Sequence, residues 1–193
     1  MKNVLILNAT PRNRINCEVK IPRANYECVV QAESKCYQIQ DVLTSKLNSN
    51  CFECINIKGI QGCTACYGCV KSGKCIKNDV MKDIYPKLEW CNKLFIITPL
   101  YYATIPSQLL AFFNRLYPYW ISSYDLDPKT GFPNKYPKIE VTTFGTCADP
   151  WQDWTLFDDT LNHIYNEIGW KNDGIFHMPV SNEHTIAAMI EKF

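Results

Sequence analysis

Near its start the chain carries Val4-Leu5-Ile6-Leu7-Asn8-Ala9, an apolar run that is followed at once by Thr10-Pro11-Arg12. A short continuous apolar run with turn-forming residues behind it is typical of a strand that is buried on both faces of a sheet. Four more runs of this kind occur at residues 52–57, 94–98, 139–144 and 175–179. We therefore expect five buried strands.

Amphipathic segments separate these runs. Apolar residues recur every three or four positions in residues 36–47, 81–91, 109–120 and 157–168, the spacing that places them on one face of a helix. Asn78 or Asp79 can cap the second of these helices. A last helix is expected over residues 183–193, with Ser181 or Asn182 as its cap.

Strands that alternate with helices predict a parallel sheet with helices on both faces. The pattern fits an α/β, flavodoxin-like, doubly wound five-stranded sheet with strand order 2-1-3-4-5. In that order the loops after strands one and three meet, and a ligand binds there. Two segments, residues 11–33 and 122–137, are long and polar and receive no helix or strand.

The composition is that of an ordinary globular protein. The 193 residues suit a single domain, 1–193, in which 47% of residues are hydrophobic and 20% are charged. A formal net charge of +1 provides no field that would gather nucleic acid or a membrane surface. The first apolar run is too short for a signal-peptide core or a membrane span, so we expect a cytoplasmic protein.

The loop after strand one offers groups that bind phosphate. Thr10 and Arg12 bring a hydroxyl and a guanidinium ahead of a helix N-terminus, which suits a phosphate monoester. The alternative is a simple polar turn. The chain has no G-x-G-x-x-G and no G-x-x-x-x-G-K-[ST], which argues against a dinucleotide fingerprint and a P-loop.

The loop after strand three reads Pro99-Leu100-Tyr101-Tyr102-Ala103-Thr104-Ile105-Pro106. Adjacent tyrosines at this position can offer ring faces and backbone N–H groups to a flat heterocycle, and prolines at both ends restrict the loop. The alternative is that the tyrosines only cover the core.

The loop after strand four includes Gly145, which permits close backbone approach, and Thr146 or Trp151, which can border a cofactor. Core or interface packing is the competing interpretation for Trp151 and Trp154. Three dispersed histidines are expected to be structural or exposed, and no catalytic residue is assigned; they are His163, His177 and His184.

Four cysteines form a C-x2-C-x2-C-x5-C run: Cys63, Cys66, Cys69 and Cys75. This spacing is too tight for a set of structural disulfides and suits an iron–sulfur cluster or a metal ion. The other seven cysteines are scattered and are expected to act as small buried apolar residues.

Three motifs, in order, resemble those of one family. Asn8-Ala9-Thr10-Pro11-Arg12 is similar to its "GSPR" phosphate loop, and residues 62–81 are similar to "C..C..C…GkCvikDDM". Residues 99–115 are similar to "PvYf…s.qlKaflDR". The family is the flavodoxin-fold NAD(P)H-dependent FMN reductases, including the iron–sulfur flavoproteins, and the resemblance covers roughly residues 1–120.

The resemblance implies that FMN places its phosphate on the first loop and its isoalloxazine on the Tyr101-Tyr102 loop. Hydride would pass from NAD(P)H to the flavin and electrons onward to a small-molecule or protein acceptor. The implied cofactor-binding residues are Thr10, Arg12, Asn16, Ser34, Pro99, Leu100, Tyr101, Tyr102, Ala103, Thr104, Gly145 and Thr146.

The chain also departs from the family pattern. It carries an insertion within residues 13–33, so that Ser34, Asn16 or Cys17 is left to replace the second phosphate hydroxyl. Val80 stands where the second Asp of "DDM" is usual, and Asn114 stands where the Asp of "DR" is usual. Residues beyond about 120 match weakly.

The resemblance leaves the role of the four cysteines open. They hold a [4Fe–4S] cluster, as in iron–sulfur flavoproteins, or the protein uses flavin alone; zinc is a third option. Rival functions are a flavin electron carrier that does not bind NAD(P)H, and a zinc or interaction module without flavin. The family and the aromatic residues 117–120 imply a homodimer or homotetramer.

Overall fold

A computed structural model represents the chain. It describes residues 3–11, 14, 18–23, 26–31, 34–47, 52–121, 136–147, 149 and 151–178.

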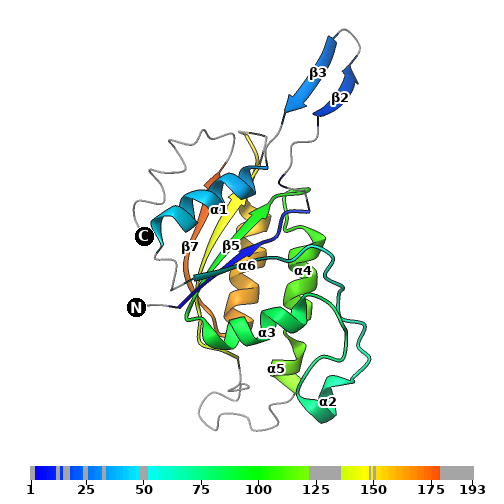
Figure 1. Cartoon of the computed structure of the whole chain (residues 1–193), viewed down its shortest axis with the longest axis vertical. Coiled ribbons are helices and arrows are strands. Elements are labelled where there is room, and N and C mark those ends of the chain that lie inside the picture. The colour runs from blue at the N-terminus through cyan, green and yellow to red at the C-terminus, as the bar shows by residue number, and fades with distance from the viewer. Residues whose placement is uncertain are drawn as a thin grey trace.

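Five parallel strands form the central sheet (Figure 1). In chain order they are β1 (Val4–Asn8), β4 (Phe52–Asn56), β5 (Lys93–Pro99), β6 (Glu140–Thr146) and β7 (Lys171–Met178). Their spatial order is β4-β1-β5-β6-β7, and every neighbouring pair is parallel. This is the predicted order 2-1-3-4-5, so the flavodoxin-like α/β fold is confirmed.

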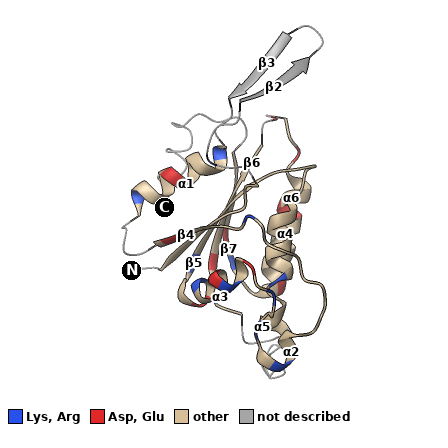
Figure 2. Cartoon of the chain, turned by 45° about the vertical axis from the view of Figure 1, so that its right-hand side comes forward, with Lys and Arg blue, Asp and Glu red and all other residues tan. Residues whose placement is uncertain are grey.

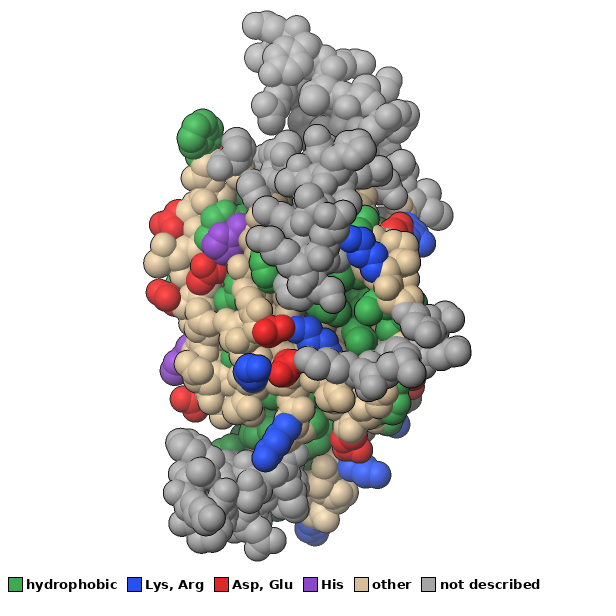
Figure 3. Space-filling model, turned by 90° about the vertical axis from the view of Figure 1, so that its left-hand side faces the viewer, with side chains coloured by type: hydrophobic (Ala, Val, Ile, Leu, Met, Phe, Trp, Pro, Cys, Tyr) green, Lys and Arg blue, Asp and Glu red, His purple; other side chains and the backbone are tan. Residues whose placement is uncertain are grey.

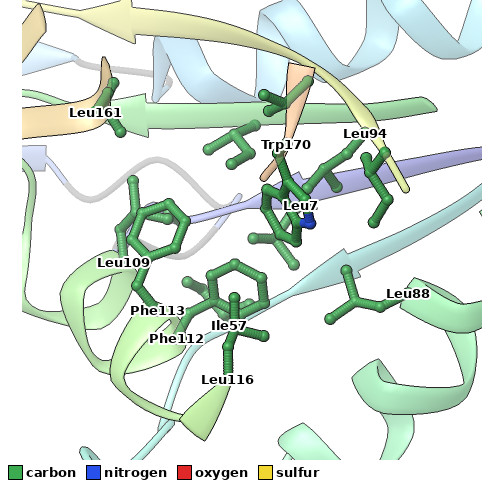
Figure 4. Close-up of a cluster of buried hydrophobic side chains, with 14 of the residues drawn as sticks. Leu7, Ile57, Leu88, Leu94, Leu109, Phe112, Phe113, Leu116, Leu161 and Trp170 are labelled. Atoms are coloured by element: carbon green, nitrogen blue, oxygen red, sulfur yellow. The ribbon is translucent and has the colours of Figure 1, made fainter. Parts of the chain in front are cut away.

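Helices cover both faces of the sheet, as the apolar strands require. The helix α1 (Lys35–Lys46) packs on one face, and α3 (Met81–Trp90), α4 (Ser107–Asn114) and α6 (Thr155–Ile168) pack on the other. Alternate side chains of β1 serve the two layers, with Leu5 and Leu7 in the larger cluster and Val4 and Ile6 in the smaller. Figure 4 shows the larger cluster, where Leu7 lies near Trp170 and Leu94.

The helix predicted over residues 109–120 is in fact two helices. The helix α4 ends at Asn114, and a short helix α5 (Tyr117–Ile121) follows after a turn. Pro118 has no N–H to donate to the Asn114 carbonyl, so one continuous helix would lose a hydrogen bond there. The Arg115 N–H instead bonds to the carbonyls of both Ala111 and Phe112, which tightens the end of α4.

Other boundaries differ by a few residues. The last strand begins at Lys171 rather than at residue 175, and a one-turn helix α2 (Cys69–Ser72) lies inside the cysteine run. The helix predicted over residues 183–193 lies outside the described residues.

The segment that received no helix or strand ahead of α1 contains a hairpin. Strands β2 (Glu18–Arg23) and β3 (Tyr26–Gln31) pair antiparallel. The hairpin extends away from the sheet in Figure 1. The hairpin therefore lengthens the β1–α1 connection but does not join the central sheet.

Charges of both signs are interspersed on the surface. Figure 2 shows this over the helices, and Figure 3 shows it for the face that it presents. None of the helices in the described parts of the chain is long and apolar enough to cross a membrane.

Candidate functional site

Two hydroxyl groups meet where β1 ends. Thr10 Oγ1 lies 3.3 Å from Ser34 Oγ, and both residues are buried. The Thr10 N–H donates to Asn8 Oδ1 at 3.0 Å, which fixes the turn after the strand. Ser34 immediately precedes α1, and its side chain makes no capping hydrogen bond to that helix. The two hydroxyls therefore stand at a helix N-terminus, a favourable place for an anion.

The hairpin insertion explains why residues so distant in sequence meet there. Strands β2 and β3 lie between Thr10 and Ser34 in the chain, and the two hydroxyls are nevertheless neighbours in the fold. Of the alternatives for the second hydroxyl, Ser34 lies beside Thr10, whereas Asn16 and Cys17 lie outside the described residues. The predicted phosphate residues Arg12 and Asn16 lie outside the described residues.

The loop after β5 is a tight two-residue hairpin turn. Tyr101 and Thr104 exchange backbone hydrogen bonds of 3.1 and 3.0 Å. Tyr102 and Ala103 between them have φ of 51° and 60°, a left-handed conformation that is unfavourable for residues other than glycine. Tyr102 is fully exposed, at 100%, and Tyr101 is 40% exposed. Strained backbone with exposed aromatic rings is common at ligand-binding loops.

The other predicted residues of this loop have structural partners. Pro99 ends β5 opposite Thr146, and the Leu100 N–H donates to the Thr146 carbonyl at 2.8 Å. The Leu100 side chain belongs to the larger apolar cluster. These residues join the loops after β5 and β6 to each other.

The loop after β6 is packed rather than open. A Cβ on Gly145 would lie 2.7 Å from the ring of Trp154, so this glycine makes room for an aromatic side chain. Trp154 stacks on His177 with ring centroids 4.4 Å apart, and His177 Nε2 lies 2.8 Å from Asp158 Oδ1. Contact of Gly145 with a cofactor stays a prediction. Trp151, in contrast, is 91% exposed.

The three loops are joined at one edge of the sheet. The Ala9 N–H donates to the Ile97 carbonyl at 2.8 Å, which links the ends of β1 and β5. Thr146 is buried, and its Oγ1 lies 3.5 Å from Cys36 Sγ in the first turn of α1. The predicted residues Thr10, Ser34 and Thr146 therefore surround the start of one helix.

Sequence reasoning missed Lys35, the first residue of α1. Its Nζ atom is buried and has no hydrogen-bond partner among the described residues. Burial lowers the pKa of Lys35, and the charge of Cys147 acts in the opposite direction. A basic residue directly after Ser34 was the available signal.

The four cysteines of the motif line one small cavity of about 20 Å³. Cys63 and Cys66 are exposed, Cys75 is partly buried and Cys69 is buried. The Ala65 N–H donates to Cys63 Sγ at 3.4 Å, and Ala65 itself has a left-handed φ of 51°. Burial, and then the nearby thiols of the other three cysteines, raise the pKa of Cys69.

Four thiols around one cavity match the donor set of a [4Fe–4S] cluster or of tetrahedral zinc. The cavity has room for about one water molecule as it stands. Within the described ranges no three His, Cys, Asp or Glu side chains are grouped closely enough to hold a metal ion. The donors therefore fit such a group chemically, whereas the loop has to rearrange around it.

A buried ion pair anchors the cysteine loop. Arg115, at the end of α4, is paired with Asp79 at 2.6 Å and also donates to the Gln61 carbonyl at 2.8 Å. Burial alone would raise the pKa of Asp79, but hydrogen bonds from Arg115 and from two backbone N–H groups hold it below its usual value. Burial alone would lower the pKa of Arg115, but the hydrogen bond to Asp79 and nearby charges raise it above its usual value.

Because one arginine holds both ends of the loop, residues 61 and 79 stay close while the cysteines lie between them. Asp79 also accepts the Met81 N–H at 3.1 Å, so it helps to start α3, although the N-cap residue is Val80 rather than the predicted Asn78 or Asp79.

The two sites lie at different ends of the molecule. In Figures 1 and 2, which differ by a turn about the vertical axis, α2 and α5 stay at the bottom, away from α1. Residues of both helices help to line the cysteine cavity, whereas the Thr10–Ser34 contact lies between the end of β1 and the start of α1.

Comparison with known proteins identifies the family of this chain. Residues 3–136 match the family described as NADPH-dependent FMN reductase. The chain therefore belongs to the NADPH-dependent FMN reductase family, and the resemblance seen in the three motifs is confirmed.

Two curated relatives carry the name iron–sulfur flavoprotein. The protein of Archaeoglobus fulgidus is 29% identical over 83 residues, which is 41% of this chain and 38% of that protein. The protein of Methanosarcina thermophila is 28% identical over 109 residues, which is 56% of this chain and 49% of that protein. The matches thus span about half or less of these relatives.

Solved structures share the fold. An NAD(P)H:quinone oxidoreductase from Methanothermobacter marburgensis superposes with a TM-score of 0.61 at 13% identity, over 98% of this chain and 92% of that one. An FMN-dependent NADH-azoreductase from Bacillus anthracis has a TM-score of 0.57 at 15% identity, over 100% and 95%.

Proposed function

We propose that this protein is an FMN-dependent oxidoreductase that takes hydride from NAD(P)H and passes electrons to a small-molecule or protein acceptor. The observation that carries the proposal is the contact of Thr10 with Ser34 at the N-terminus of α1, beside the loops that follow β5 and β6. A phosphate needs such donors, and the strand order brings the two loops to the same edge.

Each part of the edge has a separate task. The hydroxyls of Thr10 and Ser34 and the first N–H groups of α1 hold the phosphate, together with the predicted Arg12 and Asn16. The loop from Tyr101 to Thr104 orients the ring system with backbone N–H groups and aromatic faces. Thr146 closes the other side. FMN, when bound, supplies the capacity to accept a hydride and to release electrons.

The test is an absorption spectrum of the purified protein, followed by anaerobic addition of NADH or NADPH. An NAD(P)H-dependent oxidoreductase shows a flavin spectrum that bleaches without any other protein. A flavin spectrum that persists after both nucleotides are added would instead indicate an electron carrier. A colourless protein that binds no added FMN would refute the proposal.

A second candidate adds a [4Fe–4S] cluster on Cys63, Cys66, Cys69 and Cys75. All four thiols line one cavity, and a backbone N–H already donates to Cys63 Sγ, the kind of bond that tunes such clusters. The curated relatives are named iron–sulfur flavoproteins. Iron and sulfide analysis of anaerobically purified protein tests this candidate. Zinc without iron would favour the metal alternative, and neither metal would leave a reductase that uses flavin alone.

Assembly into a homodimer or homotetramer is part of the proposal. Exposed aromatic rings favour it, since Tyr102, Trp120 and Trp151 all lie largely in solvent in one chain. Light scattering at micromolar concentration is the measurement, and a monomer would count against this assembly.

A further inference from the structure

A cavity of about 330 Å³ lies beside the cavity of the four cysteines. Its walls come from the turn after α2, from α3 and from α5, which lie close to one another in Figures 1 and 2. Sites for small molecules in proteins begin at about 300 Å³. None of the described residues that line the cavity is among those proposed to bind FMN. The cavity is therefore a separate candidate site.

Rigid rings make up much of its wall. Tyr85 and Tyr119 both line the cavity, with ring centroids 5.8 Å apart and ring planes at 77° to each other. Pro86 of α3 and Pro118 of α5 also line it. Aromatic and proline rings present flat apolar surfaces whose shape hardly changes on binding, and aromatic rings pair favourably with other aromatic rings. The wall therefore suits a flat aromatic ligand.

The hydroxyl groups of the two tyrosines are already used by the protein. Tyr85 donates to the carbonyl of Arg115 at 2.5 Å, and Tyr119 donates to Glu89 Oε1 at 3.4 Å. Burial raises the pKa of Tyr85 and of Tyr119, so both phenols stay neutral. The tyrosines thus offer ring surface to a ligand rather than charge.

Two lysines supply positive charge at the same cavity. Lys74 follows α2 and Lys82 lies in the first turn of α3, and both are exposed. Neither ammonium is hydrogen-bonded or ion-paired with any residue that the structure describes. Glu89 is the one carboxylate among the described lining residues, and it accepts the Tyr119 hydroxyl. Two cations against one carboxylate favour an anionic ligand.

We propose that this cavity binds a small planar aromatic molecule that carries an acidic group, such as a carboxylate or a sulfonate. The rings of Tyr85 and Tyr119 hold the aromatic part, and Lys74 and Lys82 attract the acidic group. Cys75 lines this cavity as well as that of the four cysteines, so the ligand lies beside the cysteine site. The inference goes beyond the proposed function and does not depend on FMN binding.

The experiment uses two probes that share one ring system and differ in charge, 2-naphthalenesulfonate and 2-naphthalenesulfonamide. Isothermal titration measures their affinities for the full chain, first loaded with FMN and freed of unbound flavin. The loading keeps a flat anion from reporting on the flavin site. The double variant Lys74→Gln/Lys82→Gln is compared with Lys71→Gln/Lys46→Gln, which removes two exposed charges outside the cavity.

We expect the wild type to bind the sulfonate more tightly than the sulfonamide. In Lys74→Gln/Lys82→Gln the sulfonate should bind about tenfold more weakly, because two exposed charges are lost. The sulfonamide should stay within about twofold, since it has no charge to lose. Added salt should weaken sulfonate binding in the wild type more than in this variant. Lys71→Gln/Lys46→Gln should behave as the wild type.

A second pair of variants tests the ring wall. Tyr119→Ala should weaken both probes roughly tenfold, because an aromatic contact and its buried area are lost. Tyr85→Phe keeps its ring and should bind both probes as the wild type does. Circular dichroism checks that each variant is folded. If Tyr119→Ala does not fold, Tyr119→Leu takes its place, since it keeps apolar bulk without the flat ring.

A wild-type chain that binds neither probe would overturn this inference and leave the proposed function standing. Equal affinity for the sulfonate and the sulfonamide would overturn the choice of an acidic ligand. The same loss in Lys71→Gln/Lys46→Gln as in Lys74→Gln/Lys82→Gln would overturn the assignment to this cavity. A chain that binds no FMN but shows the expected pattern with both probes would uphold the inference and refute the proposed function.

Discussion

The edge proposed to bind flavin, made of the ends of β1, β5 and β6 with the start of α1 and called the flavin edge below, differs from the cysteine loop in how its groups are held. At the flavin edge, backbone hydrogen bonds such as Leu100 N–H to the Thr146 carbonyl join neighbouring loops to one another. In the cysteine loop, residues 61–79, one ion pair holds the ends, and the four thiols between them line one cavity without being grouped closely enough to hold a metal ion.

The difference follows from where each site is built. The flavin edge extends a parallel sheet, whose strands set the spacing of the loops before any ligand arrives. The cysteine loop has little secondary structure, and metal binding to such loops is coupled to their ordering. The flavin edge is thus preorganised by the fold, whereas the cysteine loop depends on the group that it binds.

The largest effect should come from the cysteines. If they hold a cluster, Cys69→Ser removes one of the four iron ligands, and bound iron should be lost almost completely while FMN stays bound. FMN stays because the two sites lie at different ends of the molecule (Figures 1 and 2). Iron content and flavin absorbance are measured together, with Cys54→Ser as the control. Joint loss of iron and FMN would show that the sites are coupled.

The anchor of the cysteine loop should matter most for stability. Arg115→Met leaves the Asp79 carboxylate buried without its partner, where Arg115 is 1% and Asp79 8% exposed in the side chain. The free energy of unfolding in urea should fall by about 3–5 kcal/mol. The surface pair of Lys87 with Glu53 is the control, since Lys87→Met should cost about 0–1 kcal/mol. Equal losses in both variants would contradict this ranking.

On the flavin edge, Arg12→Ala should weaken FMN binding by about 1.5–3 kcal/mol, because one charge-assisted contact to the phosphate is removed. Isothermal titration measures the affinity. Arg14→Ala is a matched control, because Arg14 pairs with Asp41 on the surface. Unchanged affinity in the Arg12 variant would remove this residue from the site.

Gly145 separates packing from cofactor contact. A Cβ there would lie 2.7 Å from Trp154 and 3.0 Å from Phe157, so Gly145→Ala should lower the free energy of unfolding by about 1–3 kcal/mol. FMN affinity should hardly change if packing is the role of the glycine. Gly62→Ala, where the Cβ meets nothing within 4 Å, is the control. Weaker FMN binding without loss of stability would instead support the predicted contact of Gly145 with the cofactor.

The smallest effect concerns pH. The pKa of Asp79 is lowered in the folded chain, so the pair with Arg115 stabilises the protein above the ordinary aspartate pKa of about 3.9. That contribution is lost as the pH falls from this value toward the lower folded pKa. Unfolding in urea from about pH 5 downward should therefore show a shallower pH dependence for Asp79→Asn than for the wild type. Parallel curves would mean that this carboxylate does not contribute.

The elements could be predicted because their signals are local. The run Val4-Leu5-Ile6-Leu7 has no polar face, and only a strand with helices on both sides can bury all four residues. The break between α4 and α5 was missed although Pro118 marks it, because the apolar spacing of residues 109–120 continues across the turn.

The site could be predicted only in part. Thr10 and the four cysteines stand in recognisable motifs, whereas Ser34 was one of several alternatives, and its position 3.3 Å from Thr10 is visible only in the structure. Lys35 and the pairing of Arg115 with Asp79 were missed, because burial of a charge is a property of packing rather than of sequence spacing.

By itself, then, the sequence predicted the five strands, most of their helices, the loops proposed to face a ligand and the cysteine donor set, since period and turn chemistry are written in neighbouring residues. Only the tertiary structure showed that the Ser34 hydroxyl lies beside Thr10, that Lys35 Nζ has no hydrogen-bond partner among the described residues, and that Arg115 holds the cysteine loop. These are contacts between segments far apart in the chain, and their energies depend on burial that no local pattern specifies.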